Sequence, residues 1–113
     1  MHEMSLCESV IQIIEQEART RGFHSVRTVW LEIGQLAGVE VEALRFAFDA
    51  VTRDSVAQGA RLEILDRPGE AWCMQCGTTV RISQRFDACP NCDSYQLQVT
   101  GGTEMRVIEL EGE

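Results

Sequence analysis

The sequence predicts an α+β protein in which a small mixed three-stranded sheet carries two helices and a zinc ribbon is inserted between two strands. Two segments with apolar residues at helical spacing predict the helices, and short runs of strand-type residues predict the sheet. Two Cys-x-x-Cys pairs predict the ribbon. The chain has 113 residues, 44% of them hydrophobic, which is enough for one compact core and a small subdomain.

The first element is a helix expected from Met4 to Arg21 and ended by Gly22, because glycine readily adopts the left-handed conformation of a helix C-cap. Apolar residues recur at helical spacing and define its buried face. They are Leu6, Cys7, Val10, Ile11, Ile13, Ile14 and Ala18. Since Cys7 lies on this face, it is expected to be a small buried hydrophobic residue and not a metal ligand.

A strand and a second helix follow. Val29, Leu31 and Ile33 alternate with Thr, Trp and Glu, as in a strand with one buried face. A helix is expected from about Glu40 to Arg53, with apolar residues on one face. They are Leu44, Ala47, Phe48 and Val51. Phe46 lies off this face and is expected to be exposed.

Domain boundaries follow from a change of composition at Pro68-Gly69, after a strand expected from about Arg61 to Asp66. Beyond Gly101-Gly102, the run from Glu104 to Leu110 returns to strand composition. One strand cannot bury its face alone, so this run is expected to pair with the sheet of the first domain. Residues 1–69 and 96–113 are therefore expected to form the α/β domain, and residues 70–95 the inserted ribbon.

The cysteine spacing is the strongest single motif. Cys73 and Cys76 form one Cys-x-x-Cys pair, Cys89 and Cys92 form another, and twelve residues separate the two pairs. Two such turns can place four thiolates around one ion at about 2.3 Å per Zn–S bond. Since protein thiolates fill all four positions, the spacing predicts a structural zinc site, with no position left for water or substrate.

Three other uses of these cysteines are less well supported. A thioredoxin-type redox motif would have one Cys-x-x-Cys pair in a βαβ setting, which neither pair has. A disulfide scaffold is typical of secreted proteins, and the first ten residues contain no basic signal-peptide region. An iron site of the rubredoxin kind stays open, because the spacing does not separate iron from zinc.

Charge and hydropathy disfavour some partners. The net charge is −8, with 18 acidic residues against ten basic ones, and the chain contains no lysine. Such a surface repels phosphate backbones, so a nucleic-acid partner is not expected. No apolar run approaches the roughly 18 to 20 residues that cross a bilayer, so no membrane association is expected and the protein is expected to be cytoplasmic. No nucleophile, base and orienting acid occur in a recognisable order, so an enzyme is not expected.

The amino terminus, Met1-His2-Glu3, offers a second kind of metal site. Terminal residues are usually solvated and inert. Here, however, the Met1 amine, the His2 amide nitrogen and His2 Nδ1 can close two adjacent chelate rings on one metal ion. Glu3 can add an amide nitrogen or a carboxylate. This nitrogen-rich set suits Ni(II) or Cu(II) and suits Mg(II) or Ca(II) poorly. Its ligands must lose protons to bind, so acid is expected to release the metal.

These features together resemble the HypA/HybF family of hydrogenase nickel-insertion factors. The resemblance rests on Met1-His2-Glu3, the first helix, Ile33-Gly34, the two cysteine pairs and the ending from Glu104 to Ile108, in this order along the chain. It implies a nickel metallochaperone for the maturation of nickel–iron (NiFe) hydrogenase. It also implies that Ni(II) is a weakly bound, transient cargo and that Zn(II) is structural.

The resemblance assigns roles to individual residues. It implies that His2 is the essential nickel ligand, that Met1 contributes its amine and that Glu3 is a supporting ligand. Glu40 stands where relatives can carry another acid and is expected near the nickel. The resemblance also implies that zinc is held by the cysteines of both pairs, Cys73, Cys76, Cys89 and Cys92. Cys7 and His24 match no family ligand.

The resemblance further implies that the partners are a HypB-type GTPase, the large subunit of NiFe hydrogenase and, in some organisms, urease maturation factors. An alternative function, that of a zinc-ribbon module for nucleic-acid or protein interaction, remains to be compared with this one. Residues 70–95 carry only Arg81 and Arg85 as basic side chains against Glu70, Asp87 and Asp93, which disfavours the nucleic-acid form of that alternative.

Overall fold

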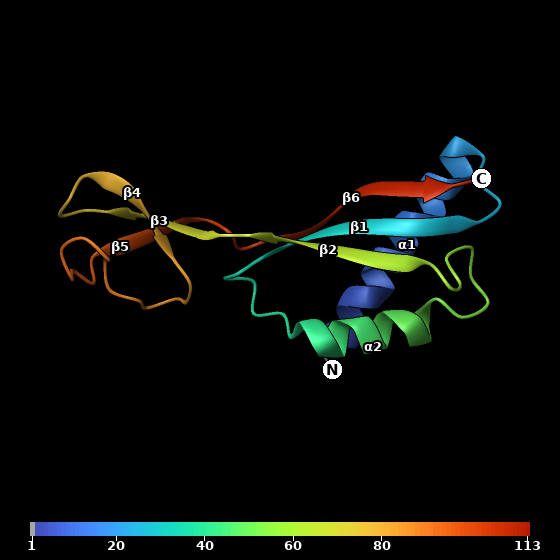
Figure 1. Cartoon of the computed structure of the whole chain (residues 1–113), viewed down its shortest axis with the longest axis horizontal. Helices are drawn as coiled ribbons and strands as arrows, with labels where there is room; N and C mark the ends of the chain where they lie inside the picture. The colour runs from blue at the N-terminus through green and yellow to red at the C-terminus, as the bar shows by residue number, and fades with distance from the viewer. Residues whose placement is uncertain (1) are drawn as a thin grey trace. The chain divides into compact units, whose positions relative to one another are not determined.

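The computed structural model describes residues 2–113 and contains two helices and six strands (Figure 1). The strands form two three-stranded sheets, with the orders β2-β1-β6 and β4-β3-β5. These elements confirm the expected α+β class. Their bounds are α1 His2–Arg21, β1 Val26–Gly34, α2 Val41–Val51, β2 Arg61–Arg67, β3 Gly69–Cys73, β4 Thr78–Ile82, β5 Leu97–Gly101 and β6 Met105–Gly112.

The chain divides into two compact units. The first contains the residues up to Leu31, Val39–Leu65 and Arg106–Glu113, and the second contains Glu32–Gly38 and Asp66–Met105. The second unit therefore extends beyond the 70–95 range expected for the ribbon. It also includes β5 and the segment Glu32–Gly38, which contains the last residues of β1. No helix within residues 2–113 is long and apolar enough to span a membrane.

Helix α1 buries one narrow stripe. The buried residues are Cys7, Val10, Ile14 and Ala18. Ile13 was expected on this face, but 51% of it is exposed. That expectation was wrong because about 100° of helical rotation separates Ile13 from Ile14 and carries it off the stripe. The C-cap is confirmed: Gly22 has φ +74° and the Phe23 N–H donates to the Ala18 carbonyl oxygen at 2.8 Å.

Helix α2 is shorter than expected at its C-terminal end. Thr52 is the C-cap, and its hydroxyl donates to the Phe48 carbonyl oxygen at 2.8 Å, so the helix does not reach Arg53. Leu44, Ala47 and Phe48 are buried as expected. Phe46 is 78% exposed, in line with its place off the apolar face.

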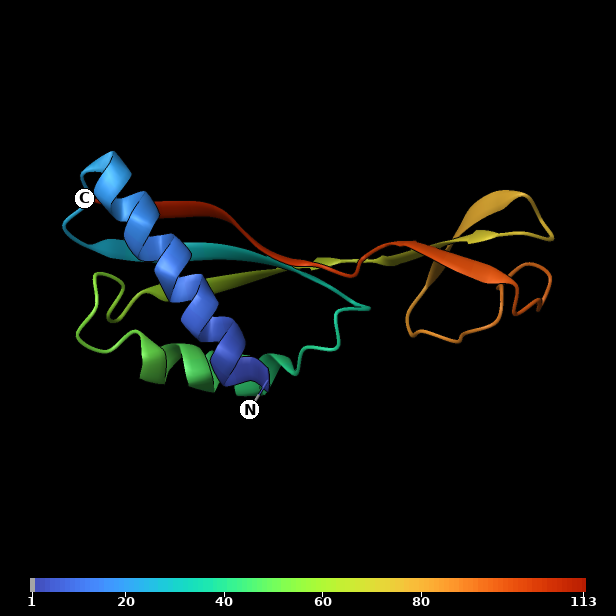
Figure 2. The same ribbon diagram turned by 180° about the vertical axis from the view of Figure 1, so that it is seen from behind.

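The first sheet is mixed, and its last strand comes from the end of the chain. Ser25 and Glu113 exchange two backbone hydrogen bonds at one end of β1, and the Gly34 N–H donates to the Glu104 carbonyl oxygen at the other. Strand β6 is therefore antiparallel to β1, which confirms the expected return of the final strand. Strand β2 runs in the direction of β1, and α1 crosses one face of this sheet (Figures 1 and 2).

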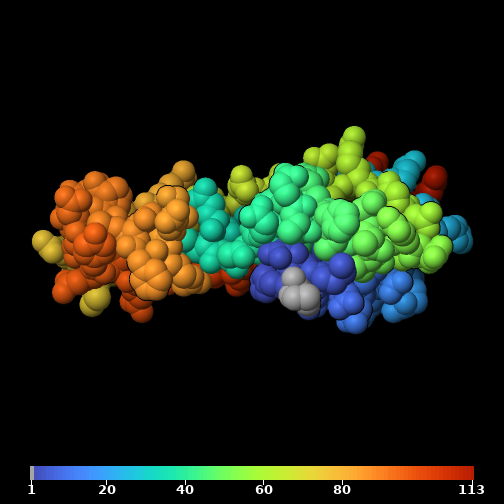
Figure 3. All heavy atoms as spheres, turned by 90° about the horizontal axis from the view of Figure 1, so that it is seen from below, coloured from blue at the N-terminus to red at the C-terminus, as the bar shows by residue number. Residues whose placement is uncertain are grey.

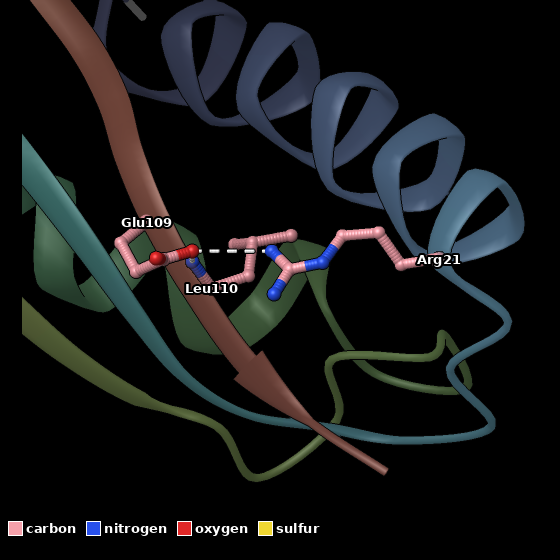
Figure 4. A network of polar contacts seen from close by, with 3 residues as sticks. All are labelled: Arg21, Glu109 and Leu110. Carbon is pink, nitrogen blue, oxygen red and sulfur yellow. Dashed lines mark hydrogen bonds and ion pairs between the residues drawn. The ribbon is translucent and has the colours of Figure 1, made fainter.

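The C-terminal end of α1 is tied to β6. Arg21 Nη1 donates to Glu109 Oε1 at 3.1 Å, and the same oxygen accepts from the Leu110 N–H at 2.8 Å (Figure 4). The guanidinium also lies 4.6 Å from the centroid of the Phe23 ring. Helix α1 is thus held at this end by a polar network as well as by its apolar stripe.

The second sheet forms the ribbon. Strand β3 pairs antiparallel with β4, from Gly69 opposite Ile82 to Cys73 opposite Thr78, and antiparallel with β5 on its other edge. Its inner face carries a small core, formed by Leu36, Ala71, Cys73, Val80, Ile82 and Cys89. Two of the four expected metal ligands are therefore part of the apolar core of this unit.

The backbone approaches itself closely between Gly34, the last residue of β1, and Gly102, which follows β5. A Cβ atom on Gly34 would collide with the Gly102 carbonyl oxygen, and Gly102 itself has φ +78°. The same carbonyl oxygen accepts from the Leu36 N–H at 2.8 Å. At position 34 only glycine fits the space, and at position 102 glycine also adopts the left-handed conformation without strain.

Candidate metal centres

The first cysteine pair lies at the end of β3. Cys73 is the last residue of the strand, and the Gly77 N–H donates to its carbonyl oxygen at 2.8 Å. Gly77 has φ +68°, a left-handed conformation that glycine adopts readily in a tight turn. The Cys76 N–H points back at Cys73 Sγ at 3.3 Å, as a donor to a thiolate does. The turn therefore presents both sulfur atoms on one side.

The second pair lies in the loop between β4 and β5. The Cys89 N–H donates to the Ser94 carbonyl oxygen at 2.8 Å, and the Asp93 N–H donates to the Cys89 carbonyl oxygen at 2.9 Å. Asp93 takes φ +62°, so it has the role in this turn that Gly77 has in the first. The Asn91 N–H approaches Cys89 Sγ at 3.4 Å. The two pairs thus use the same kind of turn.

The four sulfur atoms converge on one point. They all lie within 4.8 Å of one another, and within residues 2–113 no other group of three or more His, Cys, Asp or Glu side chains meets that condition. Sγ of Cys73 lies 3.7 Å from that of Cys92, and Sγ of Cys76 lies 3.8 Å from that of Cys89. A tetrahedral ion with bonds of about 2.3 Å requires sulfur atoms about 3.8 Å apart. The donor set therefore fits Zn(II).

The pKa values of Cys73 and Cys76 are shifted in opposite directions. The Cys76 N–H, together with smaller contributions from neighbouring donors, lowers the pKa of Cys73 to about 7. Hydrogen bonding with Cys92, together with burial, raises the pKa of Cys76 to about 12. Without a metal, the cluster therefore favours a thiolate at Cys73, which accepts hydrogen bonds from its neighbours. A metal that needs four thiolates must displace the remaining protons.

The second candidate group lies where the two helices begin. The Glu40 N–H donates to Glu3 Oε2 at 3.1 Å. The start of α1 therefore lies beside the start of α2, as the space-filling view also shows (Figure 3). This hydrogen bond is the largest cause that lowers the pKa of Glu3, so the carboxylate stays ionised. His2 is exposed at the first position of α1, and Met1 lies outside the described residues.

The structure thus brings the Glu3 carboxylate next to the backbone N–H of Glu40. Both residues were expected near the nickel, but this hydrogen bond was not predicted from the sequence. Glu40 is the N-cap residue of α2, but its own side chain makes no capping hydrogen bond. Glu3, 37 positions away, supplies the acceptor. A signal was present in the sequence, because glutamate is a poor N-cap and a helix that starts without Ser, Thr, Asp or Asn requires another partner.

The two residues that matched no ligand have other surroundings. Cys7 is 1% exposed, and its thiol lies 3.5 Å from the Leu44 carbonyl oxygen. Burial, with a smaller contribution from the charge of Glu3, raises the pKa of Cys7 to about 11. His24 is exposed. Cys7 is therefore the buried hydrophobic residue that the sequence predicted.

Comparisons with known proteins show the family of this chain. A family model described as "Hydrogenase/urease nickel incorporation, metallochaperone, hypA" matches residues 1–112. Hydrogenase maturation factor HypA of Albidiferax ferrireducens is 68% identical over 113 residues, which is 100% of each chain. The protein of the same name from Alkalilimnicola ehrlichii is 61% identical over 111 residues, 98% of each chain.

Solved structures of HypA proteins also match this chain. The solution structure of the Ni metallochaperone HypA from Helicobacter pylori superposes with a TM-score of 0.71 at 28% identity, covering 97% of this chain and 96% of that one. A second structure, titled as a solution structure of HypA protein, gives a TM-score of 0.72 at 29% identity and covers 100% and 97% of the two chains. With a family match over almost all of its length, this chain belongs to the HypA family of hydrogenase maturation factors and nickel metallochaperones.

Proposed function

We propose that this protein binds Ni(II) at its amino terminus and delivers it during maturation of NiFe hydrogenase, while the four cysteines hold a structural zinc ion. The observation that carries the nickel site is the contact between Glu3 and the Glu40 N–H beside the exposed His2. It supports a site in which carboxylates surround the nitrogen donors of the first residues.

The nitrogen donors come from the start of α1. The first four N–H groups of a helix have no partner within the helix, so forming α1 does not consume the His2 amide nitrogen. In the proposed site this nitrogen, His2 Nδ1 and the Met1 amine bind nickel in one plane. Glu3 and Glu40 supply the nearby negative charge, either as ligands or through a bound water. Such a nitrogen-rich set is typical of Ni(II) and Cu(II).

A labile site follows from this position. The N-terminal end of a helix carries partial positive charge, which disfavours a cation by about 0.3 to 1 kcal/mol. The carboxylates of Glu3 and Glu40 offset this repulsion. Because His2 is exposed, ligands of another protein can reach the nickel directly. We therefore propose that delivery is a ligand exchange in a docked complex, with no catalytic step on this chain.

The proposed partners follow from the same chemistry. A HypB-type GTPase and the hydrogenase large subunit are the proteins with which nickel would be exchanged, and urease maturation factors are further candidates in organisms that make urease. In the zinc site, Cys73 lies in the ribbon core and all four sulfur atoms come from the protein. A bound Zn(II) would link the two turns and stabilise the ribbon, with no open position for cargo.

The nucleic-acid alternative is weaker. Segment 66–105 carries three arginines against five acidic residues: Arg67, Arg81 and Arg85 against Asp66, Glu70, Asp87, Asp93 and Glu104. It has no basic face that would attract a phosphate backbone. The protein-interaction alternative is compatible with nickel delivery, since a carrier must dock to its receiver.

The test is a nickel titration of the zinc-loaded full chain by calorimetry. The wild type is compared with His2→Ala, with a variant extended by a few residues before Met1, and with His24→Ala as the matched control at the other exposed histidine. We expect the wild type and His24→Ala to bind about one nickel per chain. We expect His2→Ala and the extended variant to show no nickel binding of that affinity. Equal binding in all four proteins would remove the terminal site. Zinc content, measured in parallel, should not change.

A further inference from the structure

The ribbon carries a short loop whose tip is held in an unfavourable conformation. Phe86 takes φ +74°, a left-handed conformation that bulky side chains rarely adopt, and 92% of its surface is exposed. Backbone strain of this kind persists only where the surroundings impose it, and it concentrates at functional sites. A large apolar side chain that is both strained and solvent-exposed contributes nothing evident to the fold.

The loop is held in place from both sides. Asp87 Oδ2 accepts hydrogen bonds from the Ser83 N–H at 3.2 Å, the Ser83 hydroxyl at 3.3 Å and the Gln84 N–H at 3.1 Å. The Asp87 N–H donates in turn to the Gln84 carbonyl oxygen at 3.2 Å. Ile82 before the loop and Cys89 after it are both buried in the ribbon core. The tip is therefore preorganised, which lowers the entropic cost of binding a partner.

A hollow of about 140 Å³ opens beside this tip. It is lined by the buried or half-buried Ile82, Leu97 and Val99. The exposed Arg85, Phe86 and Tyr95 also line it, and we call them its rim. Cavities of about 150 Å³ with apolar walls accept a group as large as benzene, so this hollow has room for one apolar side chain. Tyr95 is 76% exposed, so the rim joins two aromatic rings and an arginine, the residue types that dominate binding hot spots.

The free charge at the rim is positive. Asp87 also borders the hollow, but its carboxylate is occupied by the three hydrogen bonds within the loop. Arg85 forms no ion pair with any residue in the described range 2–113. A partner group that enters the hollow would therefore meet an unpaired guanidinium, which favours a carboxylate next to it.

We propose that this hollow, with the Arg85–Phe86 tip, is a docking site for a partner-protein segment in which an apolar side chain lies next to a carboxylate. The apolar side chain fills the hollow against Phe86 and Tyr95, and the carboxylate pairs with Arg85. The rest of the chain is strongly acidic, so an acidic segment is repelled elsewhere and directed to this site. The proposal does not depend on nickel binding at the amino terminus.

The test uses the zinc-loaded full chain, labelled with ¹⁵N, and a short synthetic peptide with one leucine between two glutamates. We expect the backbone amides of the loop and of Tyr95 to shift on titration. A peptide with lysines in place of the glutamates, and one with glycine in place of the leucine, should each bind at least about tenfold more weakly, the change that one well-packed contact carries. Absence of binding, or equal binding of all three peptides, would overturn the proposal.

Variants separate docking from folding. Arg85→Glu and Phe86→Gly should each weaken binding of the leucine peptide about tenfold or more, whereas Arg81→Glu should not. Arg81 is the matched control, because it precedes Ile82 on β4 and alternation along a strand turns it to the opposite face. Glycine relieves the strain at position 86, so the thermal midpoint of Phe86→Gly should equal or exceed that of the wild type.

Three results would contradict this assignment. Wild-type binding by Arg85→Glu or Phe86→Gly would remove the site. A lower thermal midpoint in Phe86→Gly would mean that the ring supports the fold and not a partner. The third result would come from analytical ultracentrifugation. If the wild type self-associated and Phe86→Gly did not, the hollow would be occupied by a second copy of this chain and not by a partner protein.

Discussion

The backbone N–H of Glu40 donates to the carboxylate of Glu3 at 3.1 Å, so a side chain of α1 caps the start of α2. This contact links the two helices where the proposed nickel ligands lie. It also holds Glu3 in its ionised form, because a hydrogen bond to the carboxylate lowers the pKa of Glu3. One interaction therefore serves the fold and the charge of the site.

The first prediction concerns this contact. In Glu3→Ala the Glu40 N–H loses its acceptor and the site loses a charge, and we expect nickel affinity to fall by about 10- to 100-fold, as when a residue that orients a metal ligand is removed. In Glu3→Gln the amide oxygen can still accept the hydrogen bond, so the fall should be smaller. Glu40→Gln removes the second charge and keeps the N–H, and its affinity should also fall. Calorimetric nickel titration measures all three.

Glu42 offers the matched control, since it also lies in the first turn of α2. Nickel affinity in Glu42→Gln should match the wild type. If Glu3→Ala bound nickel as tightly as Glu42→Gln, the contact between the helices would have no part in the site.

The second prediction concerns zinc. Cys76→Ala removes one of four sulfur atoms, and a three-thiolate remainder no longer closes the tetrahedron. We expect zinc content to fall from about one per chain to near zero, because metal binding and folding of such a unit are coupled. Amide signals of β3, β4 and β5 should lose dispersion, whereas those of α1 and α2 should keep it. Metal analysis and ¹⁵N-correlation spectra give both readouts.

Cys7→Ala is the control for this experiment, since it removes a cysteine outside the cluster. It should keep the full zinc content. Retained zinc in Cys76→Ala would contradict the assignment of four cysteine ligands. A loss of zinc in Cys7→Ala would mean that Cys7 also contributes to the zinc site.

The third prediction concerns Cys7 itself. Burial and the nearby charge of Glu3 raise the pKa of Cys7 to about 11, so little thiolate exists at neutral pH. We expect no reaction of Cys7 with an alkylating reagent at pH 7.5 until the protein unfolds. Cys7→Ala should lower the free energy of unfolding by about 1 kcal/mol, since it removes one buried sulfur atom. Mass spectrometry after a labelling time course, with and without denaturant, checks the reactivity. Rapid labelling in the folded state would contradict the burial of this thiol.

Local patterns in the sequence predicted much of the fold. The helical spacing of Val10, Ile14 and Ala18, and the glycine at position 22, are enough to place α1 and its end. The cysteine spacing likewise predicted a four-sulfur cluster, because two short turns can present their ligands in few ways. The last strand could be placed in the first sheet because a single strand cannot bury its apolar face alone.

Long-range contacts account for most of what the sequence did not predict. The cap that Glu3 provides for α2 joins residues 37 positions apart. The poor N-cap residue at position 40 indicates that a partner is needed, but no local pattern says that Glu3 is that partner. The conformation of Phe86 follows from the hydrogen bonds of Asp87 and from the buried ends of its loop. Strand β5 is different. Leu97 and Val99 alternate with polar residues, so the period-two signal was present, although the expected ribbon ended at residue 95.

The last prediction concerns pH and the ion pair between α1 and β6. The Leu110 N–H and, after it, Arg21 lower the pKa of Glu109. Because the folded-state pKa lies below the unfolded one, the contact stabilises the protein above the usual carboxyl pKa, and the stabilisation is lost as the pH falls through the lower folded value. In Arg21→Gln we expect the pKa of Glu109 to rise part of the way and to stay below the usual range, since the Leu110 N–H remains. Arg27→Gln, whose partners are Glu111 and Glu113, should leave the pKa of Glu109 unchanged. Carboxyl ¹³C titrations of the three proteins measure this. An unchanged value in Arg21→Gln would mean that the ion pair does not persist in solution, and a return to the usual range would assign the whole effect to Arg21.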